Sequence, residues 1–178
     1  RRPPAYGYGR PDPAEEGRDF AAGCGIGEIR PCGWWRIRMR ISTSTSMKKE
    51  FSELYQAAWA AAKPRRLSDY AEAGGVGAAI LTKAGNLYTG VCIDSACSMG
   101  FCAEHAAAAA MVTAGEQEVA RMVAVNHQGE ILPPCGRCRE FISQLAEGNK
   151  EAEILVEPDR AVRLRALLPC DWKKEADA

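Results

Sequence analysis

The stretch Phe101-Cys-Ala-Glu-His-Ala-Ala-Ala-Ala-Ala110 places a thiol, a carboxylate and an imidazole directly ahead of a run of alanines. Alanine has the highest helix propensity, so this run predicts a helix over about residues 102–113, with Gly115 as its C-terminal stop. The start of a helix needs only a capping residue. Three reactive side chains at that point therefore indicate a chemical site in addition to a cap.

A second cysteine stretch, Leu132-Pro-Pro-Cys-Gly-Arg-Cys-Arg139, opens another predicted helix at about residues 136–146. The spacing of Cys135 and Cys138 lets both sulfurs at a helix start reach one metal ion, and Cys102 could supply a third ligand. Catalytic zinc takes about three protein ligands and keeps one position open, and thiolates suit it. Glu104 would then hang beside the open position as a proton carrier.

Each cysteine motif alone has little specificity. A single Cys-x-x-Cys fits a structural metal site or a redox pair equally well, and Cys-Ala-Glu is a common tripeptide. At helix starts, however, free N–H groups and the helix dipole favour thiolate over thiol. Taken together, Cys-x-Glu and Pro-Cys-x-x-Cys match the zinc-deaminase pattern in its three-cysteine form.

The composition is typical of one soluble globular domain. The chain has 178 residues, of which 47% are hydrophobic and 26% charged. Twenty-three basic residues balance twenty-three acidic ones, so no overall field attracts nucleic acid or a membrane surface. No apolar run is long enough to span a bilayer, and we expect a cytoplasmic protein. Eight cysteines in a reducing compartment favour metal binding or catalysis over disulfides.

Residues 1–46 differ in composition from the rest of the chain. They are rich in proline and glycine, contain no lysine, and carry eight arginines against five acidic residues. This predicts a disordered extension, or a misassigned upstream start, ahead of a domain at 47–178. A targeting segment is a poorer fit because Glu15, Glu16 and Asp19 are acidic. Cys24 and Cys32 could pair or bind a metal, but no partner motif lies nearby.

Hydrophobic periodicity predicts alternating helices and short strands after Met47. Apolar residues at helical spacing predict a first helix at about 47–62, ended by Pro64. The turn Lys83-Ala-Gly-Asn86 joins two β-favouring runs into a hairpin. The predicted strands and the final short element cover 76–82, 87–93, 119–126, 152–157 and 162–168. This alternation predicts an α/β layered domain.

The chain resembles the small zinc-dependent cytidine deaminases and, with them, the blasticidin S deaminases. The resemblance runs from about Met47 to Trp172. The motifs that carry it are Val76-Gly-Ala-Ala79, Thr89-Gly90, Cys102-Ala-Glu104, Pro134-Cys-Gly-Arg-Cys-Arg139 and Leu167-Leu-Pro169.

The resemblance implies a three-layer α/β/α domain with a mixed sheet, usually assembled as a homotetramer and alternatively as a dimer. It implies one zinc ion per subunit, held by Cys102, Cys135 and Cys138, with Glu104 as the catalytic acid and base. The implied reaction is hydrolytic deamination of cytidine or deoxycytidine to the uridine compound and ammonia, as in pyrimidine salvage.

The chain departs from the family pattern where the nucleoside binds. Cys92 and Asp94 stand where the family usually has Asn-x-Glu to hold the ribose hydroxyl, and the loop that follows is about one residue short. Gly74 replaces an aromatic residue that stacks on the base. The substrate-binding residues that we expect are Asp94, Ala103, Tyr70 and Trp172.

A charge argument adds a supporting residue around the metal. Three thiolates give a Zn²⁺ site a net charge of −1, which a nearby donor must offset if the bound water is to stay acidic. The family commonly has an arginine after the glutamate, and this chain has His105. We expect His105 or Arg139 to donate to a ligand sulfur.

Two other functions stay open at this stage. The missing ribose motif favours a modified or antibiotic cytosine nucleoside, such as blasticidin S, as the substrate. A non-catalytic zinc module is the alternative of another class, although a closed structural site has no use for Glu104. Polynucleotide editing is disfavoured because the domain after Met47 has a net charge of −3 and no evident aromatic and basic groove.

Overall fold

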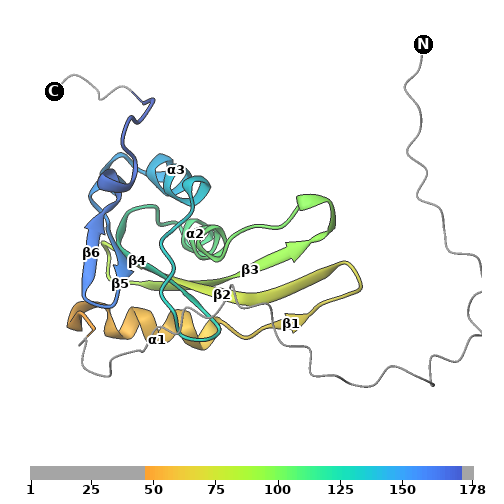
Figure 1. Cartoon of the computed structure of the whole chain (residues 1–178). Helices are drawn as coiled ribbons and strands as arrows, with labels where there is room; N and C mark the ends of the chain where they lie inside the picture. The colour runs from red at the N-terminus through yellow and green to blue at the C-terminus, as the bar shows by residue number, and fades with distance from the viewer. Residues whose placement is uncertain (1–46, 174–178) are drawn as a thin grey trace, which may run out of the picture. The chain divides into compact units, whose positions relative to one another are not determined.

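The computed structural model describes residues 47–173, which form a six-stranded mixed sheet with helices on both faces (Figure 1). The expected three-layer α/β/α architecture is confirmed. The elements in chain order are η2 (Lys49–Phe51), α1 (Ser52–Ala61), β1 (Arg65–Arg66), β2 (Ala71–Thr82), β3 (Leu87–Ser95), η3 (Ala96–Ser98), α2 (Ala103–Thr113), β4 (Val119–Asn126), α3 (Gly136–Leu145), η4 (Glu147–Glu151), β5 (Glu153–Glu157), β6 (Arg160–Arg163) and η5 (Leu164–Leu167).

Strand β2 is the centre of the sheet. Its Ala73 pairs with Arg65 of β1 and Ile93 of β3, and its Gly77 pairs with Val91 of β3 and Val125 of β4. Strands β1 and β4 therefore follow one another along the same edge of β2, opposite β3. The β4–β5 pair is parallel and the other pairs are antiparallel, which makes the sheet mixed.

The two faces of the sheet bury two separate apolar clusters, because successive side chains of a strand point to opposite faces. Figure 1 shows α1 on one face and α2 and α3 on the other. The α1 side buries Phe51, Leu54, Ala58, Ala79, Val123, Val125 and Leu155. The α2 side includes Ala78, Ile80, Ala103, Ala107, Met111, Met122, Ala124, Ile142 and Ile154.

The alanine run lets α2 lie directly on the sheet. A Cβ at Gly90 of β3 would overlap the backbone nitrogen of Ala107, so the helix and the strand touch through their backbones. Ala103, Ala107 and Ala108 are completely buried at this contact. The packing fixes where α2 begins, and with it the position of Cys102.

A bulge interrupts β2 beside the same region. The pairing with β3 shifts register between Ala73 and Gly77, and Gly74 adopts a positive φ of 83°. A side chain at Gly74 would overlap the carbonyl oxygen of Lys63. The buried Sγ of Cys92 accepts a hydrogen bond from the N–H of Val76 at 3.2 Å. Cys92 therefore satisfies a backbone donor at the bulge.

Most of the expected elements are present, with shifted ends. The strand expected at 119–126 is β4 itself, whereas β2 begins at Ala71 and the last strand begins at Arg160. The short β1 and the turn at Ala96–Ser98 were not expected. Within residues 47–173, the structure contains no helix with the length and apolar character needed to cross a bilayer. The extension expected at 1–46, including Cys24 and Cys32, lies outside the described residues.

Candidate active site

Three cysteine thiols converge between the starts of α2 and α3. Cys102 is the N-cap of α2, Cys135 is the N-cap of α3, and Cys138 lies in the first turn of α3. The Sγ of Cys135 lies 3.7 Å from that of Cys102 and 3.4 Å from that of Cys138. The Sγ atoms of Cys102 and Cys138 lie within 4.8 Å of each other. The three sulfurs thus form a compact triangle.

Backbone N–H groups at the start of α3 stabilise a thiolate at Cys135. Burial alone raises the pKa of this thiol, but hydrogen bonds from the N–H groups of Cys138 and Arg137 and from the neighbouring thiols bring it below its usual value. The pKa values of Cys102 and Cys138 are raised, chiefly by burial. In the absence of a metal, Cys135 is therefore the most readily ionised of the three.

Glu104 lies beside the thiols in the first turn of α2. Its side chain is only 5% exposed, and burial raises the pKa of its carboxyl group above the usual range. Hydrogen bonds from its own backbone N–H and from the Cys138 thiol offset part of this rise. A buried carboxyl group with a raised pKa takes up a proton more readily than an exposed one, which suits a group that must both accept and release protons.

A cavity of about 580 Å³ opens in front of Glu104 and the thiols of Cys102 and Cys135. Sequence stretches from β2, β3, the start of α2, the end of β4 and the Pro-Pro loop contribute to its wall. Its lining residues are Gly75, Val76, Cys92, Asp94, Gly100, Phe101, Cys102, Ala103, Glu104, Ala124, Asn126, His127, Leu132, Pro133, Cys135 and Arg137. Cavities of this size hold small molecules.

The two residues expected to support the metal behave differently. His105 lies against the thiols, with its Nδ1 atom 3.5 Å from the Sγ of Cys138, and its ring stacks on Phe141 with centroids 4.4 Å apart. Burial, and then the charge of Arg137, lowers the pKa of His105. The guanidinium group of Arg139 instead donates to the backbone oxygens of Pro134 and Leu167, at 2.7 and 3.2 Å.

The four expected substrate-binding residues fall into two groups. Asp94 and Ala103 line the cavity. The structure does not bring Tyr70 there, because its side chain is 76% exposed and borders a separate surface hollow beyond Asp94. Trp172 also lies outside the cavity, with its indole N–H donating to Glu140 of α3 at 2.8 Å.

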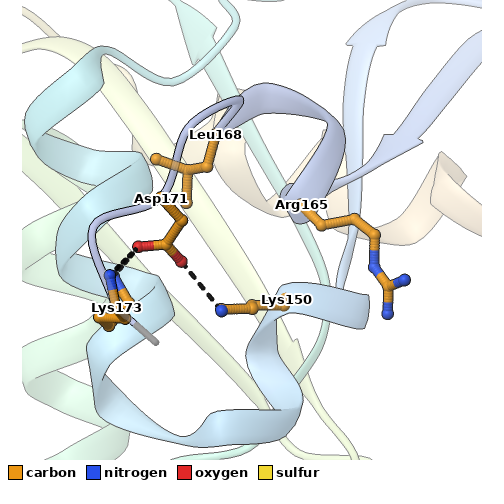
Figure 2. A pocket seen from close by; sticks show the side chains of 5 residues that line it. All are labelled: Lys150, Arg165, Leu168, Asp171 and Lys173. Carbon is orange, nitrogen blue, oxygen red and sulfur yellow. Dashed lines mark hydrogen bonds and ion pairs between the residues drawn. The ribbon is translucent and has the colours of Figure 1, made fainter. Parts of the chain in front are cut away.

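Trp172 belongs to a C-terminal segment. Ion pairs hold this segment against α3 and η4. The ammonium groups of Lys150 and Lys173 lie 2.9 and 3.0 Å from the carboxylate of Asp171, and Lys173 also pairs with Glu140 at 2.7 Å. Figure 2 shows both ammonium groups directed at Asp171, with Arg165 extending away from them. Arg165 pairs with Glu151. A second surface hollow is lined by Lys150, Arg165, Leu168, Asp171 and Lys173, and each of its three positive charges is paired with a carboxylate.

The donor set of the thiol triangle fits a zinc ion. Thiolates bound to one tetrahedral zinc at about 2.3 Å stand roughly 3.8 Å apart. The two short sulfur separations are close to this value. A ring nitrogen of His105 also lies within 4.8 Å of the Sγ atoms of Cys102 and Cys138, so a second trio of donors shares two of the same sulfurs.

Four further residues line the cavity that the motifs did not predict there: Phe101, Asn126, His127 and Arg137. Phe101 comes directly before Cys102, and Arg137 lies between Cys135 and Cys138. Their adjacency to the cysteines could have predicted that Phe101 and Arg137 lie at the site. Nothing in the local sequence marks Asn126 and His127, which the sheet brings to the cavity from the end of β4.

Comparison with known sequences identifies a family. A family model described as "Cytidine and deoxycytidylate deaminase zinc-binding region" matches residues 48–150, a range that contains all three thiols and Glu104. A cytidine deaminase of Mycobacterium tuberculosis is 35% identical over 95 residues, which is 53% of this chain and 69% of the relative.

Solved structures agree with this match. The crystal structure of cytidine deaminase from Mycobacterium tuberculosis superposes with a TM-score of 0.60 and 30% identity, covering 71% of this chain and 100% of the other. Cytidine deaminase from Mycobacterium leprae gives a TM-score of 0.58 and 29% identity, covering 68% and 99% of the two chains.

Proposed function

The chain belongs to the cytidine and deoxycytidylate deaminase family, a family of zinc-dependent hydrolases, and from this we propose that it converts a cytosine nucleoside to the uracil nucleoside and ammonia. The observation that carries this proposal is the position of Glu104. A nearly buried carboxyl group with a raised pKa stands at the wall of a cavity, beside three converging thiols. A purely structural metal site has no use for such a group.

The thiols of Cys102, Cys135 and Cys138 are the zinc ligands in this proposal. Zinc held there supplies a Lewis acid that makes a water molecule nucleophilic near neutral pH. We prefer Cys135 over His105 as the third ligand because its pKa is lowered and its sulfur is close to both others. His105 then donates from Nδ1 to the Sγ of Cys138, which disperses the negative charge of the thiolates.

Glu104 carries the protons of the reaction. As the oxygen of water bonds to C4 of the ring, the carboxylate accepts the proton that water loses and passes it to N3. Glu104 next takes the proton of the new hydroxyl group and gives it to the exocyclic amine. The C4–N bond then breaks with its electron pair going to nitrogen, ammonia leaves and a C4 carbonyl remains. Its raised pKa suits both directions of transfer.

Residues at the start of α2 and at the end of β3 orient the substrate. The first N–H groups of a helix have no partner within it, and at the start of α2 the intrahelical bonds begin with His105. The N–H of Ala103 is therefore available to the ring. The carboxylate of Asp94, at the cavity wall, could accept from a sugar hydroxyl. We also propose that the protein is a homo-oligomer, a tetramer or a dimer.

A modified or antibiotic cytosine nucleoside is a second candidate substrate. The observation that favours it is Cys92, whose sulfur accepts from the N–H of Val76 and cannot replace an amide that donates to ribose. An unmodified ribose would then lose one hydrogen bond at this wall.

Ammonia release by the zinc-loaded protein tests the proposal. Cytidine, deoxycytidine, cytosine and blasticidin S are offered side by side. Turnover of cytidine and deoxycytidine supports the leading substrate class and a role in pyrimidine salvage, whereas turnover of blasticidin S alone supports the second candidate. Stoichiometric zinc without ammonia from any of the four would favour a non-catalytic zinc module and contradict the proposal.

A further inference from the structure

We propose that Phe101 supplies the aromatic wall against which the pyrimidine ring lies in the active site. This inference rests on the proposed function and assigns a positioning residue to the same cavity. Phe101 is not part of the motifs that carry the family resemblance. The position where the family has an aromatic residue that stacks on the base is occupied by Gly74, at the bulge of β2.

The bulge of β2 prevents position 74 from carrying an aromatic side chain. Gly74 has a φ of 83°, and a Cβ there would overlap the carbonyl oxygen of Lys63. The obstacle is backbone, which cannot move aside as a flexible side chain can. A substrate ring in this cavity must therefore find its apolar wall elsewhere.

Other aromatic residues near the site are turned away from the cavity. Tyr70 borders the separate hollow beyond Asp94, and Trp172 is bonded to Glu140 on α3. Phe101 and His127 are the two aromatic residues among those that line the cavity. Of these, Phe101 is the apolar one, and 36% of it remains exposed. An exposed phenyl ring at a cavity wall leaves apolar surface for a ligand to cover.

The backbone holds Phe101 in a fixed position beside the thiols. Its N–H donates to the oxygen of Ile93 at 2.9 Å, and its carbonyl accepts from the N–H of Ile93 at 3.0 Å. Gly100 allows this pairing, because a Cβ there would overlap the Ile93 oxygen. The next residue is Cys102, so the ring and the thiol triangle are placed by the same stretch of backbone.

A stacking residue binds the ring similarly in the ground state and in the transition state. Its removal should therefore raise KM and leave kcat nearly unchanged. Loss of one aromatic contact of this kind corresponds to about a 10-fold weaker affinity. A residue that merely stabilised the fold would lower the fraction of active protein instead, without raising KM.

The test uses the full-length, zinc-loaded protein and compares the wild type with Phe101→Ala, Phe101→Leu and Phe101→Tyr. Leu87→Ala is the matched control, because Leu87 has the same exposed fraction and lies at the β2–β3 turn, outside the cavity. KM and kcat are measured with the best cytosine nucleoside. We expect KM about 10-fold higher in Phe101→Ala, intermediate in Phe101→Leu and near wild type in Phe101→Tyr.

A binding measurement separates this inference from the proposed function. The Kd of cytidine is measured by calorimetry in a Glu104→Gln background with and without Phe101→Ala. If no cytosine compound is turned over, the proposed function fails, and a Phe101-dependent Kd still supports the aromatic wall. An unchanged KM and Kd in folded Phe101→Ala, or a loss of affinity that follows His127→Ala instead, would overturn the inference. So would the absence of any measurable nucleoside binding.

Discussion

The Nδ1 atom of His105 lies 3.5 Å from the Sγ of Cys138, and burial lowers the pKa of this imidazole below its usual value. A neutral imidazole can donate one hydrogen bond to the sulfur without adding a charge. On this account His105→Ala should weaken zinc retention or activity by about 10- to 100-fold, as loss of such supporting contacts does. Zinc retention is measured by competition with a chelator. Wild-type zinc retention together with an unchanged pH–rate profile would contradict this role.

Arg139 should behave as a structural residue. Its guanidinium group bonds to the backbone oxygens of Pro134 and Leu167, and so ties the Pro-Pro loop to the C-terminal 3₁₀ turn. Arg139→Ala should lower the free energy of unfolding by about 1.5–3 kcal/mol, the range for hydrogen bonds that involve a charged group. Urea titration of the zinc-loaded protein measures the loss. If Arg139→Ala kept wild-type stability but lost zinc, Arg139 would instead be a residue that supports the metal site.

Cys135 is the third zinc ligand in our proposal, and His105 belongs to the competing trio. Cys135→Ala should therefore abolish stoichiometric zinc, whereas His105→Ala should bind zinc more weakly but still at one ion per chain. Cys97→Ala is the control, because this exposed thiol lies in the η3 turn. Elemental analysis after gel filtration gives the zinc content. One zinc ion per chain in Cys135→Ala, with none in His105→Ala, would show that Cys102, His105 and Cys138 are the ligands instead.

Much of the fold could be predicted because its signals are local. A short apolar run predicted β4, and the alanine run predicted α2. Strand β1 escaped prediction because it consists of two exposed arginines, Arg65 and Arg66, and forms only by pairing with β2.

The candidate site was predictable to the extent that its residues are adjacent in sequence. Motif spacing alone predicts that Cys102, Cys135 and Cys138 bind the same metal ion. The places of Tyr70 and Trp172 were not predictable, because the direction of the chain before the bulge and after η5 depends on tertiary packing. The same is true of Arg139, whose partners lie in two other segments.

The contact between Gly90 and α2 should be sensitive to one methyl group. A Cβ at this position would overlap the backbone nitrogen of Ala107, so Gly90→Ala must push the helix off the sheet. We expect a loss of about 1–3 kcal/mol in the free energy of unfolding, with weaker zinc binding because Cys102 moves with the helix. Gly136→Ala is the stability control, since a Cβ there meets no atom within 4 Å. Equal stability of the two variants would refute the close contact.

The C-terminal segment should detach in acid. Hydrogen bonds from the backbone N–H of Lys173 and from the ammonium groups of Lys150 and Lys173 hold the pKa of Asp171 below its usual range. A lowered pKa means that the ion pairs contribute fully above the unfolded value of about 3.9 and are lost as the pH falls below it.

Hydrogen exchange of residues 164–173 measures this detachment. Protection should be constant from pH 7 to about 5 and should decrease at lower pH. Asp171→Asn should remove most of the pH dependence and show weak protection throughout. The same acid-induced loss in Asp171→Asn would assign the effect to other carboxyl groups.

The central claim is that Glu104 moves the protons of a deamination that takes place beside the three thiols. Its most direct test is ammonia release from cytosine nucleosides by zinc-loaded wild type and Glu104→Gln, with Glu53→Gln on the exposed surface of α1 as the control. We predict one zinc ion per chain in all three proteins, a loss of at least about 100-fold in kcat for Glu104→Gln, and wild-type activity in the control. Ammonia release by Glu104→Gln at the wild-type rate would contradict the account.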